Sequence, residues 1–426
     1  MPHAHTNHAL TPIAHKDRAF DLRSHLSLWF SLGVGLLVIQ VGAFLSPALG
    51  PQQALWVILA GSLIGSALLA LTAWLGCRTG LSSAGLIHGT YGPLFARVPI
   101  LLNIVQLIGW TAFELVIMRD GTLAILSNKL GLETAGPLAL IASTLVWGGL
   151  LSLLMLSSML TLVRAFINRF GLPLVTLSLL WISWTFYQIV AQTGLDSFLS
   201  KQGDGSLSLA AALDIVIAMP ISWLPLVADY ARYGKSRPST FNGTLIGYFI
   251  ANVWCYGLGF VIAGVSEPGS DLVTALLLAQ GGLFALSLIL LDELDNAYSD
   301  VYSASVCSHS LMPNLSMKQW GLGLAFASIL CAAFLPMQAL EPFLLILSSI
   351  FVPLYGVILG RALLSYHEGD RNTHTSRAIA ALIWLFGIAL FQGLTHMAPE
   401  WGATLPTLAL TVLLGQLTRP RLIDRR

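Results

Sequence analysis

The sequence predicts an all-α integral membrane protein with twelve transmembrane helices, arranged as a five-plus-five inverted repeat with two extra C-terminal helices. Three observations support this: the composition, a series of apolar segments, and helix-breaking residues in segments one and six. Hydrophobic residues make up 56% of the 426 residues and charged residues 10%, whereas a soluble protein carries about 25% charged residues. The net charge of +1 gives no indication of a nucleic-acid partner. The four cysteines lie singly, without the spacing of a metal site.

Twelve apolar segments make up the predicted membrane domain. A helix of about 20 residues crosses the hydrocarbon core of a lipid bilayer, and a helix satisfies every backbone group within its own segment. We place the segments at residues 27–48, 54–76, 98–118, 138–162, 171–192, 207–229, 243–265, 283–304, 317–337, 341–360, 377–395 and 402–418.

One transmembrane domain, residues 27–418, is expected between two short cytoplasmic tails, residues 1–26 and 419–426. The domain divides into a first repeat, a second repeat and two accessory helices, at 27–192, 207–360 and 377–418.

Basic residues set the expected orientation, because they are enriched in the cytoplasmic loops of membrane proteins. With the N-terminus inside, all but three of the 21 lysines and arginines fall on the cytoplasmic side. The three exceptions are Arg119, Lys129 and Lys201. We therefore expect a multi-pass protein of the inner (cytoplasmic) membrane with both termini in the cytoplasm.

Segments one and six contain residues that interrupt a helix at mid-depth. The first reads LWFSLGVGLLVIQVGAF, with Gly33 and Gly35 close together, and the sixth reads IVIAMPISWLPLVADY, with Pro220 and Pro225 inside it. An internal proline removes a backbone hydrogen bond and clashes with the preceding turn. Paired interrupted helices at corresponding places in two halves indicate the binding site of a transporter.

Segment three carries a polar stripe through an otherwise apolar helix. Its members Asn103, Gln106, Trp110 and Glu114 are spaced i, i+3, i+7 and i+11, so that they share one helical face. Glu114 falls near mid-bilayer, where an isolated carboxylate costs several kcal/mol and indicates a functional site. A structural hydrogen bond to a neighbouring helix is the alternative explanation.

Segment eight contains four carboxylates in the stretch LILLDELDNAYSD, residues 288–300. Spacing places four polar side chains on one face of this helix: Asp292, Asp295, Asn296 and Ser299. Glu293 and Asp300 lie on an adjacent face, and Asp300 is expected to approach the cytoplasmic surface and to be solvated. The inner acids must face the protein interior, where a cation, protons or hydrogen bonds neutralise them.

Four motifs in these segments resemble the nucleobase–cation symporter family, the cytosine and hydantoin permeases. They are GCRTGLSS after segment two, GW in segment three, ISWLPLVADYARYGKS in segment six and DNAYS in segment eight. The resemblance covers residues 20–420 and is closest to the hydroxymethylpyrimidine permease branch. It implies a LeuT-like fold, which is a ten-helix inverted repeat plus two helices.

The resemblance also implies a substrate site between segments one, three, six and eight. Trp110 matches an aromatic residue that stacks on the heterocycle. Glu114 stands where hydantoin-type members have an amide, and a carboxylate there suits an aminopyrimidine. Pro220 falls at the position of a second stacking aromatic, with Trp223 three residues on as its candidate replacement. The expected substrate-binding residues are Gln40, Gln106, Trp110, Glu114, Trp223 and Asn296.

In sodium-coupled members of this family, two hydroxyl residues of segment eight and backbone carbonyls of segment one hold the ion. Asp292 and Glu293 occupy those segment-eight positions here. A carboxylate can bind Na+ or carry H+, so both coupling ions stay open. The expected cation-binding residues are Leu36 and Ile39 through their backbone, together with Asp292, Glu293 and Asp295. No other cofactor is expected.

The expected function is import of a small pyrimidine by cation symport with alternating access, with the thiamine precursor hydroxymethylpyrimidine as the favoured substrate. Cytosine, another nucleobase or an amino acid are alternative substrates of such a carrier. A Mg-dependent membrane prenyltransferase would need a second aspartate-rich motif, and the sequence has one DxxD only. A channel would need a filter-like loop, and none is visible. The chain is therefore not expected to be an enzyme.

Overall fold

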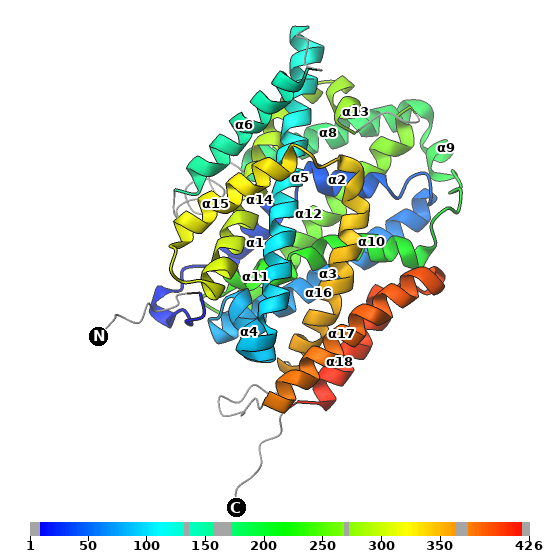
Figure 1. Ribbon diagram of the computed structural model, residues 1–426. Coiled ribbons are helices and arrows are strands. Elements are labelled where there is room, and N and C mark those ends of the chain that lie inside the picture. Colours follow the sequence, from blue (N-terminus) through cyan, green and yellow to red (C-terminus); the bar gives the residue numbers. More distant parts are fainter. Residues whose placement is uncertain (1–8, 132–135, 157–171, 268–271, 363–373, 420–426) are drawn as a thin grey trace, which may run out of the picture.

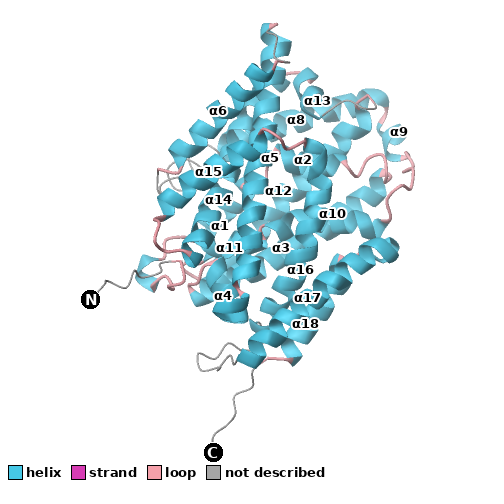
Figure 2. Cartoon of the chain, in the orientation of Figure 1, coloured by secondary structure: helices cyan, strands magenta, loops and turns pink. Residues whose placement is uncertain are grey.

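Helices make up nearly all of the described structure, which confirms the all-α prediction. The computed structural model describes residues 9–131, 136–156, 172–267, 272–362 and 374–419. The helices pack side by side (Figure 1), and loops are confined to short connections between them (Figure 2). They are α1 (Leu22–Ser31), α2 (Leu36–Ala43), α3 (Pro51–Thr79), α4 (Ser83–Phe95), α5 (Arg97–Leu130), α6 (Pro137–Leu154), α8 (Leu172–Thr193), α9 (Leu195–Leu199), α10 (Leu209–Ser222), α11 (Leu224–Ala231), α12 (Arg237–Val265), α13 (Leu272–Leu278), α14 (Gly282–Leu311), α15 (Met317–Ala332), α16 (Leu340–Ala362), α17 (His374–Met397) and α18 (Thr404–Leu417).

Eight helices within the described residues are long and apolar enough to cross a membrane, and the bent pair α1 and α2 makes a ninth candidate span. Three further predicted segments contain α14, α15 and α18. α14 contains too many polar residues to be counted with these apolar helices, and α15 and α18 are shorter, with 16 and 14 residues. The count of twelve spans therefore stays a prediction. The end of predicted segment four, after residue 156, lies outside the described residues.

Three helices lie in regions that the sequence suggested were loops, namely α4, α9 and α13. In Figure 1, α4 is near the lower end of the molecule, whereas α9 and α13 are near the opposite end. Hydropathy missed them because α9 and α13 are short and α4 falls between two much longer apolar segments.

Predicted segment one is split into two helices, α1 and α2, whose axes differ by 59°. The split covers residues 32–35 and includes both glycines of the LGVG stretch. Gly33 is also needed for packing, because a Cβ there would lie 2.8 Å from Cβ of Ala251 on α12. The break leaves the C-terminus of α1 and the N-terminus of α2 inside the protein.

Predicted segment six is interrupted at one residue, Trp223, and its two parts continue as a span over Leu209–Ala231. A proline has no N–H, so the carbonyl four residues before it loses its helical partner. For Pro220 that carbonyl belongs to Val216, which accepts a hydrogen bond from the Tyr256 hydroxyl at 3.0 Å. The carbonyl of Ser222, next to the interruption, accepts one from Nε2 of Gln106 at 3.2 Å. The interruption is thus stabilised from neighbouring helices.

Two buried acids of segment six serve as caps for other helices. Asp214 accepts hydrogen bonds from the backbone N–H groups of Ala403, at 2.6 Å, and Thr404, at 3.0 Å, at the start of α18. Asp229 accepts one from the backbone N–H of Ser83, at 2.9 Å, at the start of α4. Carboxylates stabilise helix N-termini because they satisfy free N–H groups and oppose the helix dipole. These two intramembrane acids therefore have a structural explanation.

The position of the site follows from the packing of α14 along α5. This pairing places the polar stripe of α5 opposite the acidic stretch of α14. The α1–α2 segment packs on α12 from the other side, and its break faces the same interior region.

Candidate substrate site

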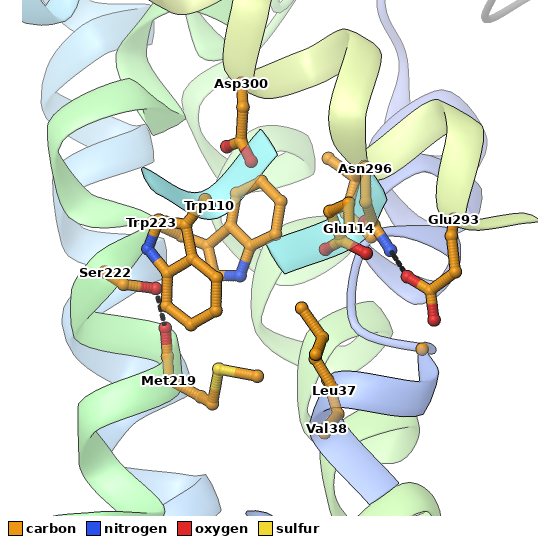
Figure 3. A pocket seen from close by; sticks show the side chains of 12 residues that line it. Leu37, Val38, Trp110, Glu114, Met219, Ser222, Trp223, Glu293, Asn296 and Asp300 are labelled. Atoms are coloured by element: carbon orange, nitrogen blue, oxygen red, sulfur yellow. Dashed lines mark hydrogen bonds between the residues drawn. The ribbon is translucent and has the colours of Figure 1, made fainter. Parts of the chain in front are cut away.

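A narrow pocket lies where the two interrupted segments meet α5 and α14 (Figure 3). Its volume is about 10 Å³, which is room for about one water molecule. The lining residues are Leu32, Gly35, Leu37, Val38, Trp110, Glu114, Met219, Ser222, Trp223, Glu293, Asn296 and Asp300. A heterocyclic ring would fit only after these side chains move apart.

Two tryptophans form one side of the pocket (Figure 3). Trp110 is held by Phe343, whose ring centre lies 5.3 Å away in an edge-on arrangement, and Trp223 is held by Trp29 at 6.1 Å. Pro220 points elsewhere, since a Cβ on Gly65 of α3 would lie 2.1 Å from its Cγ. Trp223, and not Pro220, therefore places an aromatic ring at the pocket, and its role as the second stacking residue stays a prediction.

Glu114, Glu293 and Asn296 lie together on another side of the pocket (Figure 3). Glu114 is one helical turn after Trp110, so both face the same space. Its carboxyl group lies close to that of Glu293. Two carboxylates this close repel each other unless a proton or a cation lies between them.

Glu293 also binds the N-terminus of α2. The backbone N–H of Leu36, the first residue of α2, donates a hydrogen bond to its Oε1. Nδ2 of Asn296 donates to Oε2 of Glu293 at 3.3 Å and to the carbonyl of Val34 at 3.2 Å. Gly35 leaves room for the carboxylate, because a Cβ there would lie 3.1 Å from Oε2. The positive end of the α2 dipole favours a negative charge at this place.

Asp292 and Asp295 face a different part of the break. The hydroxyl of Ser31, the last residue of α1, lies 2.9 Å from Oδ2 of Asp295 and 3.3 Å from Oδ1 of Asp292. The C-terminus of a helix carries partial negative charge, so two carboxylates there are unfavourable without a positive ligand. Each of the two also has an oxygen without a hydrogen-bond partner among the described residues.

Among the described residues, no basic side chain forms an ion pair with the acids around the pocket and the α1–α2 break. Five are buried, namely Glu114, Asp292, Glu293, Asp295 and Asp300. Across the part of the chain that the structure describes, the one ion pair joins Arg119 to Asp120. Within the same residues, no group of three or more His, Cys, Asp or Glu side chains converges as a metal site would. A cation here would therefore need hydroxyl and backbone oxygens besides the carboxylates.

Several predicted site residues lie apart from the pocket. Gln40 lines a larger cavity of about 730 Å³ beside α2, α9 and α12. Gln106 is buried behind the pocket wall, where it donates hydrogen bonds to Asn103 and Ser222. The carbonyl of Ile39 lies against Gly259 on α12, and Leu36 directs its N–H, not a free carbonyl, toward Glu293. The ligand roles expected for the backbone carbonyls of Leu36 and Ile39 stay a prediction.

The prediction for Asp300 was wrong. This side chain is 3% exposed and lines the pocket, rather than lying solvated at a membrane surface. On α14 it follows Glu293 by two turns, and Asn296 lies between them on the same face. The spacing along α14 predicted that Asn296 shares a face with Asp292, whereas in the structure Asn296 lies beside Glu293. Sequence reasoning also missed Ser31, whose hydroxyl gives no signal in the primary structure.

Residues 12–391 match the protein family described as "Permease for cytosine/purines, uracil, thiamine, allantoin". The chain belongs to this permease family. The permease is 21% identical to the cytosine permease of Escherichia coli strain K12 over 360 residues, which are 84% of this chain and 81% of that protein. It is 24% identical to the allantoin permease of Bacillus subtilis strain 168 over 57% of this chain and 52% of that protein.

The fold of the permease is similar to those of solved transporters. It matches Mhp1, a nucleobase-cation-symport-1 family transporter in a closed conformation with bromovinylhydantoin bound, with a TM-score of 0.78 and 16% identity over 97% of this chain and 95% of that one. A Na+-coupled sialic acid symporter matches with a TM-score of 0.68 and 13% identity over 95% and 90% of the two chains. The permease is therefore a multi-pass membrane transporter of this fold, and the family resemblance is confirmed.

Proposed function

We propose that the permease imports a small aminopyrimidine together with a cation, and that hydroxymethylpyrimidine is the favoured substrate. The observation that carries this proposal is that Trp110, Trp223 and Glu114 line one pocket. Cytosine is the main alternative. Likeness to the cytosine permease of Escherichia coli supports an aminopyrimidine in general and does not favour hydroxymethylpyrimidine.

One side of the pocket would stack on the substrate ring, and the other side would form hydrogen bonds with its polar groups. Aromatic side chains bind flat rings through offset or edge-on contacts, and Trp110 and Trp223 present such surfaces. Glu114 has a buried oxygen, Oε2, without a partner among the described residues. A carboxylate oxygen that accepts a hydrogen bond from an exocyclic amine forms a strong, charge-assisted contact.

The coupling cation, Na+ or H+, would bind at the α1–α2 break. Asp292, Asp295 and the Ser31 hydroxyl form one group of oxygens, and Glu293 with Glu114 forms another. Sodium favours several oxygen ligands, which suits the first group. A shared proton suits the contact between two carboxyl groups in the second group.

Transport would require movement of the broken helices. α2 separates the narrow pocket, lined by Leu37 and Val38, from the larger cavity lined by Gln40 and Ala43. With both termini in the cytoplasm and two inverted five-helix repeats, the larger cavity would be the outer entrance. Binding of substrate and cation would shift the population between outward-open and inward-open states through differential affinity.

The proposal is tested by uptake of labelled hydroxymethylpyrimidine into proteoliposomes under an imposed sodium or proton gradient, with excess unlabelled cytosine as competitor. Gradient-driven accumulation that cytosine inhibits weakly supports hydroxymethylpyrimidine and identifies the ion. Efficient competition by cytosine would indicate that cytosine is the preferred substrate. No accumulation of either pyrimidine under either gradient contradicts the proposal.

A further inference from the structure

Asp300 is the acid for which the described structure offers no internal explanation. Asp214 and Asp229 cap helices, Glu293 binds the α2 N-terminus, and Asp292 and Asp295 contact Ser31. Asp300 is 3% exposed and lines the pocket, and its carboxylate has no ion-pair partner among the described residues. Burying such a group without a partner is costly, so its presence points to a partner that arrives from outside.

The carboxyl group of Asp300 reaches the pocket from the side of the tryptophans, apart from the group formed by Glu114, Asn296 and Glu293 (Figure 3). The spacing on α14 agrees with this view, because Asp300 is seven residues beyond Glu293 and about 10 Å further along the helix axis. A bound ring between the two acidic positions would therefore face a carboxylate on each of two edges.

The free polar atoms of the pocket are mostly hydrogen-bond acceptors. Oε2 of Glu114 and Oδ1 of Asn296 have no partner among the described residues, and the carboxylate of Asp300 lines the same pocket. Most donors are already used, since Ser222 donates to the carbonyl of Met219 at 2.6 Å and Asn296 donates to Glu293. Nε1 of Trp110 is a lining donor without a partner among the described residues.

We infer that Asp300 is a second substrate-recognition residue, which together with Glu114 selects a heterocycle with hydrogen-bond donors on two separate edges. This inference rests on the proposed function and deepens it. An aminopyrimidine with an exocyclic amine and a ring N–H or hydroxymethyl group has such edges. Replacement of the amine by a carbonyl oxygen would bring an acceptor against a carboxylate, and buried polar sites reject such mismatched analogues strongly.

The test compares matched ligands on purified permease, by direct binding in detergent. The ligand pairs are cytosine with uracil, and hydroxymethylpyrimidine with its 4-oxo analogue; in each pair a carbonyl oxygen replaces the exocyclic amine, and the adjacent ring nitrogen changes from an acceptor to an N–H donor. We expect the wild type to bind the amino member at least tenfold more tightly. Asp300→Asn should weaken binding of both members of each pair tenfold or more, because the ring N–H or hydroxymethyl group that faces Asp300 is present in both, while the amino preference set by Glu114 should remain. Asp204→Asn, the same change in an exposed loop, should alter neither.

The outcomes separate this inference from the proposed function. If the wild type binds aminopyrimidines and Asp300→Asn binds them as tightly, the role of Asp300 is overturned while the function stands. If the wild type binds amino and oxo members equally, selection by acidic groups is overturned. If the wild type binds no pyrimidine, the proposed function falls and this inference with it. Should Asp300→Asn fail to fold, Asp300→Glu keeps the carboxylate and must retain binding of the aminopyrimidine.

Discussion

The backbone N–H of Leu36 on α2 donates a hydrogen bond to Glu293 on α14, so that an acid from the second half of the chain caps a helix exposed by a break in the first half. This contact joins the moving parts of the proposed transport cycle. Any change in the charge of Glu293 acts directly on the N-terminus of α2, which lies between the narrow pocket and the larger cavity.

Glu293→Gln is predicted to abolish coupling rather than folding. The amide still accepts a hydrogen bond from Leu36, but it can neither bind a cation by charge nor carry a proton. We expect gradient-driven accumulation of substrate to fall at least tenfold, while exchange of labelled for unlabelled substrate without a gradient persists. Uptake and exchange in the same proteoliposomes measure both. Accumulation at the wild-type level would contradict a coupling role.

Glu114→Gln is predicted to weaken binding of an aminopyrimidine. A hydrogen bond to a charged group contributes about 1.5–3 kcal/mol, which corresponds to a loss of affinity of about 10- to 150-fold. Equilibrium binding of labelled hydroxymethylpyrimidine or cytosine measures the effect, and thermal unfolding of the same sample shows whether the fold is affected. Equal binding by variant and wild type would eliminate the recognition role of Glu114.

Ser31→Ala is predicted to change the dependence on the coupling ion more than the affinity for substrate. The hydroxyl contacts Asp295 and Asp292 but does not line the pocket. If Na+ binds there, its half-saturating concentration for uptake should rise about tenfold, with little change in substrate affinity at saturating sodium. Ser27→Ala, one turn earlier on α1, is the matched control. A change in substrate affinity alone would argue against a cation at this place.

Trp223→Ala is predicted to reduce substrate affinity, because it removes one of the two aromatic surfaces of the pocket. Contacts between aromatic groups contribute about 0.5–1.5 kcal/mol beyond the area they bury, and loss of buried ring area adds to this. We expect at least a tenfold weaker binding, whereas Trp223→Phe should retain most of the affinity. If Trp223→Ala binds substrate as the wild type does, Trp223 is not the second stacking residue.

Asp214→Asn is predicted to affect stability but not substrate recognition. The carboxylate caps α18 through two backbone N–H groups, and loss of a helix cap costs about 0.5–2 kcal/mol. The melting temperature of the purified permease should therefore fall by a few degrees, with unchanged affinity for substrate. A large loss of affinity in a protein that melts normally would show that this acid does more than cap a helix.

Hydropathy and spacing along a single helix were enough to predict the class of fold and part of the site. Trp110 and Glu114 are four residues apart on one helix, so no tertiary information was needed to place them on the same face. The break in segment one followed from its glycines, since the stretch LGVG interrupts an apolar run. The resemblance to the symporter family implied that these segments meet at one site. The family match supports the resemblance itself.

Only the tertiary structure decided which neighbour each polar group meets. Asp214 and Asp229 are acids within a membrane segment, a feature that usually indicates a functional site. In the structure they cap helices that are distant in sequence. Gln40 is on a helix that borders two cavities and faces the larger one. These outcomes depend on how a helix is rotated and at what depth it lies, and residues far apart in the chain determine both.

The sequence by itself determined that this protein is a bundle of membrane helices with acids inside it, because burial in lipid permits few other structures and makes such acids costly. It did not determine that Asp300 faces the pocket. That placement arises from the packing of α14 against α5 and from the α1–α2 break, which together open an interior space beside this turn of the helix. The depth of a residue in the bundle depends on how the helices pack together, and the periodicity of a single helix does not determine it.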